Sequence, residues 1–451
     1  MISKLTTNMK KLIFTFILLA YTASYCQKPD LALVNGNIIT MKNDKVLLNQ
    51  TVLITGNKIS KIIPSTKWKN TENVKTIDCT GKYIMPTLVD MHMHSNPYMD
   101  TYALPFFMKY GVTTIRVMAG NDAIRVKRDS IRTNKLKGLP DIYVASELID
   151  GDPPSFGADH QGPIVTKKEQ IIPVIQEQLK KGYDFIKLYS RLKQDVFQEA
   201  VAYCKANKIK VTYHIPTDVE KSKFFQNATG EIQHMSGYAR FAHAQDSLPK
   251  KIMLKNYDVP FDEVSSKSIN NEKLKTAVSQ TVKNKIWNCP TLVLFYNKTD
   301  TIFCKNILKT KIHPGLDGLL GWWQSTGFGN TPELTNYTKF QHQTVALLHK
   351  EKAQLLAGTD FPNPWLVPGL SLHQEIERFT MAGLSNYEAL KTATVNPAIW
   401  FGPTYEKGYV AENKIADLLI LNQNPLTDVK NTTAIYQVIH NGDPYLNQEQ
   451  K

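Results

Sequence analysis

Short apolar runs and amphipathic runs alternate through the middle of the chain. The amphipathic runs, for example 166–181 and 195–206, repeat their apolar residues at helical spacing. The apolar runs have the composition of buried strands. Strands that alternate with helices predict parallel βα units, and eight of them predict an α/β fold of the TIM-type (β/α)8 barrel class. The expected strands lie at 84–89, 112–117, 142–145, 185–188, 209–213, 231–233, 286–294 and 353–357.

The two ends of the chain show a different pattern, in which short apolar strands are separated by turn residues. Near the N-terminus the expected turns are Asn-Gly-Asn at 35–37 and Thr-Gly-Asn at 55–57. Near the C-terminus an Asn-Gly pair at 441–442 follows a similar strand. Asn-Gly between apolar strands is typical of hairpins. We therefore expect one small β-sandwich domain built from 27–82 and 403–451, around a barrel at 83–402.

Two segments, 238–285 and 296–340, are too long to be simple loops. We expect them to contain helices and to roof the mouth of the barrel. The pair Trp322-Trp323 lies in the second segment. It is either a lid against a ligand or a piece of local core.

The N-terminus has the pattern of a secretory signal peptide. Lys10 and Lys11 precede an apolar stretch at 12–21, and small residues follow it. We expect a signal peptide over 1–26 and export to the periplasm or the outside of the cell. A lipid anchor at Cys26 is less favoured, because Tyr25 suits a lipid-attachment site poorly. No later apolar run is long enough for a stable membrane span.

Composition and charge narrow the choice of partners. The 451 residues carry a formal net charge of +14, spread thinly as lysine. No dense basic run with interleaved aromatic residues is present, so nucleic acid is not an expected partner. The cysteines after the leader form no CxxC motif. We expect buried thiols, and one disulfide bond among them stays open.

Polar side chains of metal-binding type stand at the carboxyl ends of the expected strands. His92 and His94 close the first strand, and alternation along a strand points both imidazoles to one face. Barrel enzymes gather their chemistry at this end of the strands. The same end carries a lysine, two more histidines and an aspartate, namely Lys187, His214, His234 and Asp360.

Each of these residues also has a purely structural interpretation. A single histidine at a strand end is more often an ordinary hydrogen-bonded residue than a ligand. Lys187 would pair with an acidic residue, or its long aliphatic chain would carry the ammonium group to the surface. Asp360, followed by Pro362 and Pro364, would simply begin a turn. All six residues, in the expected strands and in order, favour a metal site instead.

The motifs around these residues resemble those of the metal-dependent amidohydrolase superfamily, in its imidazolonepropionase-like and prolidase-like branch. The resemblance covers 31–445, and Thr87 is a minor departure because the family usually has Gly there. The motifs are highly specific for the family and only weakly specific for the substrate. The matching segments are 85–94, 111–114, 183–187, 358–360, 372–375, 393–398, 415–419 and 424–426.

The resemblance implies a centre with two divalent metal ions. One ion would be held by His92, His94 and Asp360, and the other by His214 and His234. Lys187, carboxylated by carbon dioxide, would bridge them, because a carbamate is an anionic ligand and an ammonium group is not. Zinc suits these nitrogen and oxygen ligands, with manganese, iron and cobalt as alternatives.

The implied reaction is hydrolysis of a C–N amide bond by a metal-bridging hydroxide, with Asp360 as general base and then general acid. The expected partner is a small molecule, namely a dipeptide, an N-acyl amino acid or a cyclic amide. A lactonase or other ester-type hydrolase on the same metals is one alternative. A non-catalytic binding protein is another, but it predicts broken ligand positions. A homo-oligomer also stays open.

Three residues are candidates for substrate binding. His160 follows the third strand, in a region where related enzymes use a histidine to contact the substrate. Tyr189 and Tyr238 closely follow Lys187 and His234. Either hydroxyl would donate to a substrate carbonyl or carboxylate. The competing interpretation of all three is an ordinary loop or core side chain.

Overall fold

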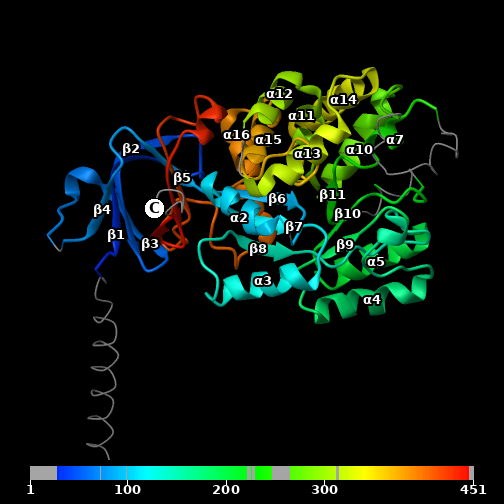
Figure 1. Cartoon of the computed structure of the whole chain (residues 1–451), viewed down its shortest axis with the longest axis horizontal. Coiled ribbons are helices and arrows are strands. Elements are labelled where there is room, and N and C mark those ends of the chain that lie inside the picture. The colour runs from blue at the N-terminus through cyan, green and yellow to red at the C-terminus, as the bar shows by residue number, and fades with distance from the viewer. Residues whose placement is uncertain are drawn as a thin grey trace, which may run out of the picture.

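The computed structural model of the chain describes residues 28–71, 73–97, 99–220, 225, 229–245, 265–310 and 314–445. It has two parts, a β-sheet at one end of an elongated molecule and a larger α/β part beside it (Figure 1). The signal peptide expected over 1–26 lies outside the described residues, so export stays a prediction. None of the described helices is long and apolar enough to cross a membrane.

Both ends of the chain contribute strands to the end sheet. The two halves join where β5 pairs antiparallel with β14. The sheet has its own apolar core, which includes Leu33, Ile84 and Leu418. Both ends therefore contribute to one continuous sheet, and its folding into a β-sandwich domain stays a prediction. Its strands are β1 (Leu31–Ile39), β2 (Val46–Thr55), β3 (Lys58–Pro64), β4 (Lys75–Asp78), β5 (Tyr83–Pro86), β14 (Leu418–Leu421), β15 (Ile435–His440) and β16 (Asp443–Pro444).

The turn expected at 35–37 is wrong. β1 runs through these residues as one strand, and its pairing with β2 shifts register at Gly36. A bulge replaces the turn because β5 approaches closely here: a Cβ at Gly36 would lie 2.5 Å from the Cδ1 of Ile84. The turns expected at 55–57 and 441–442 do join β2 to β3 and β15 to β16.

The apolar run at 83–90 forms two strands instead of the single strand expected. β5 belongs to the end sheet, whereas β6 (Leu88–Met93) begins the α/β part. Thr87 stands between them, and its N–H donates to the carbonyl of Asp417 at 3.1 Å. One residue therefore connects the end sheet to the strand that carries His92.

Parallel strands form the α/β part in two hydrogen-bonded groups, one of three strands and one of five. Isolated parallel bridges join the groups, because Ala145 pairs with Phe185 and Met93 pairs with Phe361. The strands thus follow one another in the order that a barrel requires, and the expected α/β class is confirmed. They are β6, β7 (Val112–Val117), β8 (Asp141–Val144), β9 (Ile186–Leu188), β10 (Val211–Tyr213), β11 (Glu231–Gln233), β12 (Trp287–Cys289) and β13 (Gln354–Leu355).

Helices lie on both sides of these strands (Figure 1). Several begin at caps that the sequence supplies. The Asn121 side chain accepts from the N–H of Ile124 at the start of α3, and Thr331 caps α14 with Pro332 at its first position. The helices are α2 (Asp100–Lys109), α3 (Asp122–Arg132), α4 (Lys168–Lys180), α5 (Gln194–Ala206), α7 (Tyr238–Ala242), α10 (Asn271–Lys283), α11 (Leu292–Thr299), α12 (Thr301–Lys309), α13 (Asp317–Thr326), α14 (Pro332–Lys350), α15 (Leu370–Met381), α16 (Asn386–Thr392) and α17 (Val395–Phe401).

The strand expected at 286–294 is shorter than predicted. β12 covers only the start of this run, and α11 begins at Leu292. Thr291 takes a left-handed φ of 48° and so ends the extended backbone. The N–H groups of Leu292 and Val293 then donate to the buried carboxylate of Glu375, at 3.0 and 2.7 Å, which satisfies the first turn of the helix.

The described cysteines are free thiols, so the disulfide bond left open by the sequence is not formed among them. They are Cys79, Cys204, Cys289 and Cys304, and all are buried. Burial raises the pKa of the Cys79, Cys204 and Cys304 thiols to about 12. These side chains are therefore neutral, unreactive core groups.

Candidate metal centre

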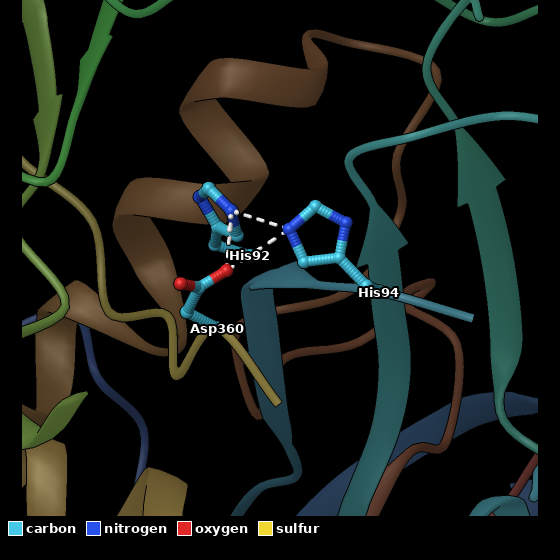
Figure 2. Close-up of side chains that lie close together, drawn as sticks. All are labelled: His92, His94 and Asp360. Carbon is cyan, nitrogen blue, oxygen red and sulfur yellow. Dashed lines mark hydrogen bonds and ion pairs between the residues drawn. The ribbon is translucent and has the colours of Figure 1, made fainter. Parts of the chain in front are cut away.

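Two histidines and one aspartate meet at the carboxyl ends of β6 and β13. The side chains of His92, His94 and Asp360 point toward one another (Figure 2). The Oδ1 of Asp360 lies 3.1 Å from the Nε2 of His92 and 3.0 Å from the Nε2 of His94. One donor atom from each residue falls within 4.8 Å of the other two. This set of nitrogen and oxygen donors suits a divalent transition-metal ion.

A glycine lets the segment that carries Asp360 approach β6. A Cβ at Gly358 would lie 2.7 Å from the Cβ of His92 and 2.6 Å from the Sγ of Cys289. The N–H groups of Thr359 and Asp360 donate to the carbonyl of His92, at 3.0 and 2.7 Å. The backbone thus holds His92 and Asp360 side by side.

The carboxylate of Asp90 joins the same two segments. It accepts from the N–H of His92 at 3.1 Å, and from the N–H and the hydroxyl of Thr359 at 3.1 and 2.7 Å. Burial raises the pKa of Asp90 to about 7, although these donors act to lower it. Asp90 therefore supports the centre and does not face its ligands.

The two other predicted histidine ligands lie beside this group. The ring centroid of His234 is 4.4 Å from that of His92 and 4.8 Å from that of His214. The Nε2 of His234 lies 4.0 Å from the Oδ2 of Asp360. Its Nδ1 is hydrogen-bonded to the hydroxyl of Thr291 at 2.7 Å, which turns Nε2 toward the centre. Four imidazoles and one carboxylate therefore gather in one place.

Lys187 lies on β9 with its side chain fully buried. Its Nζ has no hydrogen-bond partner among the described residues. Burial lowers the pKa of Lys187 to about 7, against the opposing effect of Asp360 and Glu231. A buried polar group without a partner costs free energy. Such a group in the interior of a strand is therefore a candidate for a function.

Burial also sets the protonation of the ligands. It lowers the pKa of His92, His214 and His234 well below the usual value, and neighbouring positive groups act in the same direction. Burial acts to raise the pKa of Asp360, but His234 and His92 outweigh it and hold that pKa well below its usual range. Neutral imidazole and ionised carboxylate are the forms that bind a metal.

A buried hydrogen-bond chain supports His92. The side-chain Oε1 of Gln233 meets the Nδ1 of His92, and its Nε2 donates to Glu231 at 2.6 Å. Glu231 in turn forms an ion pair with Arg116, whose Nε donates to the carbonyl of Met91 at 2.7 Å. Ligating histidines commonly have such partners, which fix the orientation of the ring.

Our sequence analysis missed Arg116, Glu231 and Gln233, although a signal was present. Each is polar and lies inside a strand that is otherwise apolar. Positions 231 and 233 fall on the same face of β11, because side chains alternate along a strand. Buried charges are rare unless they are paired. The pairing of an arginine in β7 with a glutamate in β11 could therefore have been predicted from the sequence.

The centre opens into a cavity of about 580 Å³. Tyr189 is part of its wall, with its ring centroid 4.4 Å from that of His214 and 5.6 Å from that of Phe156. Most of the lining is apolar or aromatic, and the volume suits a small molecule. The lining residues are His94, Ala119, Leu148, Phe156, Tyr189, His214, His234, Leu294, Phe295, Lys298, Trp322, Leu334, Asp360, Pro362, Asn363 and Pro364.

The two tryptophans of α13 divide between the two interpretations given above. Trp323 is buried, and its indole N–H donates to the carbonyl of Pro362 at 3.4 Å. Trp322 is 44% exposed and lines the cavity. Trp323 is thus local core, and Trp322 forms part of the cavity wall.

Two of the three predicted substrate-binding residues lie outside the cavity lining. Tyr238 is fully buried, and its hydroxyl is hydrogen-bonded to Thr281 at 2.7 Å and Asn288 at 3.0 Å. Tyr238 is therefore corrected to a core residue. His160 follows a short helix, and neither ring nitrogen has a hydrogen-bond partner among the described residues. Of the three predicted residues, Tyr189 alone lines the cavity.

Solved structures share this fold. The chain matches an Xaa-Pro dipeptidase with bound methionine in its active site, with a TM-score of 0.67 and 17% identity over 92% of this chain and 99% of that chain. It matches bottromycin amidohydrolase with a TM-score of 0.67 and 20% identity over 92% and 86%. A prolidase complexed with N-methylphosphonate-L-proline matches with a TM-score of 0.63 and 17% identity over 92% and 98%. No curated protein matches the chain.

A family model also matches part of the chain. Residues 341–444, which run from α14 to β16 and include Asp360, match the model of the Amidohydrolase family. This match confirms the resemblance seen in the sequence motifs. The match covers less than half of the chain, and the solved structures above share the fold of nearly all of it.

Proposed function

We propose that this chain is an exported hydrolase that cleaves the amide bond of dipeptides, N-acyl amino acids or cyclic amides. The observation that carries the proposal is the opening of the His92–His94–Asp360 group into a cavity of small-molecule size. Structural metal sites are usually closed by four protein ligands. The His94 side chain is 31% exposed, which leaves room for water and substrate beside it.

The described residues fit two divalent metal ions, zinc being the first choice. One ion would be held by His92, His94 and Asp360, the other by His214 and His234, and Lys187 would bridge them as a carbamate. The buried Nζ of Lys187, which has no hydrogen-bond partner among the described residues, supports this role. When bound, such ions supply a water that ionises near neutral pH, and they polarise the substrate carbonyl.

Asp360 is the residue proposed to move the proton. Its carboxylate lines the cavity, and its Oδ2 accepts from the Nδ2 of Asn363 at 2.8 Å, which fixes its orientation. It would accept a proton from the attacking water and then deliver it to the leaving nitrogen. The C–N bond breaks, and the products are a carboxylic acid and an amine. The hydroxyl of Tyr189 is our candidate donor to the substrate.

The solved relatives support a substrate of this size. Two are described as an Xaa-Pro dipeptidase and a prolidase, which favours a dipeptide or a dipeptide-like amide. The proposal also includes a closed TIM-type barrel over 83–402 and a β-sandwich domain built from 27–82 and 403–451. β5, at the start of the barrel range, pairs with strands of the end sheet. We also propose that residues 1–26 are a signal peptide.

Turnover by the purified protein tests the proposal. The chain without residues 1–26 would be loaded with zinc and bicarbonate, and its metal content would be measured. An arrayed library of dipeptides, N-acyl amino acids, cyclic amides and lactones would follow, with Asp360→Asn as the matched blank. Metal-dependent hydrolysis of an amide class supports the proposal. Hydrolysis of lactones alone, or no turnover with both metals bound, contradicts it.

A further inference from the structure

Helix α11 presents one of its faces to the cavity. Leu294, Phe295 and Lys298 are the residues of this helix that line it. Spacings of three and four residues place side chains on the same side of a helix, so these three belong to one face. A cationic side chain therefore stands among apolar neighbours in the wall of the cavity that holds the metal centre.

Charge in the cavity wall is sparse. Among the described residues that line it, Lys298 is the one lysine or arginine, and Asp360 is the one carboxylate. Asp360 is already engaged by His92 and His94, and no described acid forms an ion pair with Lys298. Attraction between opposite charges is stronger in a cavity of mostly apolar lining than in water. An anionic group on a ligand would complement the charge of Lys298.

The backbone of α11 is held firmly, so the position from which Lys298 reaches into the cavity is fixed. The carboxylate of Glu375 accepts from the first two N–H groups of the helix. Further along, the Nδ2 of Asn297 donates to the carbonyl of Trp365 at 3.1 Å and to the side chain of Gln374 at 2.8 Å. Anchoring of this kind is what a residue that selects a substrate requires.

A simpler interpretation of Lys298 is that it complements the helix dipole. It lies in the last turn of α11, where a cation is favourable. Lys309 has the same place in the last turn of α12, but it is exposed and is not among the cavity-lining residues. The dipole therefore does not account for a lysine in the wall of the cavity. Lys309 serves as the matched control.

Aromatic rings form another part of the same wall. Phe156 and Trp322 are 36% and 44% exposed, and Phe156 stacks on Tyr189 with 22° between the ring planes. Exposed rings in a small-molecule cavity favour a ligand with a bulky apolar group. The wall thus offers one cationic contact and one aromatic surface.

From these features we infer that Lys298 binds a free carboxylate of the substrate, while Phe156, Tyr189 and Trp322 receive its bulky apolar group. The inference rests on the proposed amide hydrolysis and names its substrate class, which is amides of amino acids that keep a free carboxylate. In the reaction the C–N bond breaks. The acyl carbon gains the hydroxyl of water, the nitrogen gains its proton, and the carboxylate on Lys298 is unchanged.

Binding to an inactive form tests this without turnover. The metal-loaded Asp360→Asn chain would be titrated calorimetrically with N-acetyl-L-phenylalanine and with N-acetyl-L-phenylalaninamide, which differ only in the carboxylate. We expect about tenfold tighter binding of the acid, as one charge-assisted contact provides. Adding Lys298→Met should abolish the preference, Lys298→Arg should keep most of it, and Lys309→Met should leave it unchanged.

Two results would overturn the inference. One is equal affinity for the acid and the amide in the Asp360→Asn chain. The other is a loss of affinity in the Lys298→Met variant that is as large for the amide as for the acid. An equal loss would indicate that Lys298 acts by packing and not by its charge. Failure of the proposed reaction is distinguishable, since acid-selective binding without any hydrolysis would reject the reaction alone. Hydrolysis that ignores the carboxylate would reject the inference alone.

Discussion

The side-chain carbonyl of Gln233 meets the Nδ1 of His92, while the opposite ring nitrogen of His92 faces Asp360 at 3.1 Å. A carbonyl oxygen only accepts, so Nδ1 carries the proton and Nε2 keeps its lone pair for a metal. The Gln233 amide cannot exchange the positions of its oxygen and nitrogen without losing a hydrogen bond, because its Nε2 already donates to Glu231. One glutamine thus decides which nitrogen of the ligand is available.

Replacement of Gln233 by leucine should weaken metal binding without unfolding the protein. We expect zinc affinity to fall about 10–100-fold, because the ring of His92 loses the partner that orients it. Competition with a chromophoric chelator measures the change. The exposed Gln324 on α13, changed to leucine, is the control. Equal affinity in the two variants would show that the contact does not tune the site.

Asp360→Asn should retain bound metal and lose most of its turnover. The amide keeps an oxygen donor near His92 and His94 but cannot accept the proton of the attacking water. A loss of about 10²–10⁴-fold in kcat is the usual size of a general-base contribution. Metal analysis and steady-state kinetics on one sample separate the two effects. Full activity in this variant would refute the role assigned to Asp360.

Gly358→Ala should destabilise the protein, because the new methyl group would lie 2.7 Å from the Cβ of His92. We expect a loss of about 1–3 kcal/mol in the free energy of unfolding, together with weaker zinc binding. Gly321→Ala on α13 is the matched control, since its Cβ would meet nothing within 4 Å. A gain of about 0.5–1 kcal/mol is expected there from helix propensity. Urea denaturation compares the two, and similar effects at both positions would contradict the steric argument.

Glu375 should make stability depend on pH. Burial raises its pKa to about 8 from an ordinary value of 4.5, although the N–H groups of Leu292 and Val293 act to lower it. Between pH 4.5 and about pH 8, Glu375 of the folded protein holds a proton that the unfolded chain has lost. The contribution of Glu375 is therefore fully present below pH 4.5 and is lost as the pH rises to about 8.

Glu375→Gln removes this titration and keeps an acceptor for the two N–H groups. We expect the variant to lose less free energy of unfolding than the unmodified chain between pH 5 and pH 8. Denaturant titrations at several pH values measure how the free energy of unfolding of each protein changes with pH. Parallel curves for the two proteins would show that Glu375 keeps its charge when buried.

The clustering of His92, His94, His214, His234 and Asp360 was predictable because each of these residues stands at or close to the end of a strand. His92 and His94 share one face by simple alternation, and Gly358 and Asp360 belong to one three-residue segment. Parallel strands then bring all their carboxyl ends together, so the fold class alone sufficed to place distant residues in one site. Local pattern and global topology agree here, which is why the predicted side chains lie close together; their role as metal ligands stays a proposal.

The predictions that were wrong depended on local backbone directions, which the sequence pattern alone does not contain. His234 and Met235 both take left-handed φ values, 56° and 59°, just after β11. The chain turns sharply there, and Tyr238 is carried into the core, away from the cavity. Gly36 is a similar case, because the packing of β5 against it produces a bulge and not a turn. The start of α11 at Leu292 was missed because it falls inside the apolar run at 286–294, which has the composition of a strand.

The pairing of β5 with β14 has a consequence for how the protein matures. β5 is made early and stands one residue before the strand of His92, whereas its partner β14 is made near the end of synthesis. Asp360 also emerges late. A partly synthesised chain therefore has neither the closed sheet nor the third ligand of the triad. The closed sheet and the His92–His94–Asp360 group therefore form only after nearly the whole chain has been made.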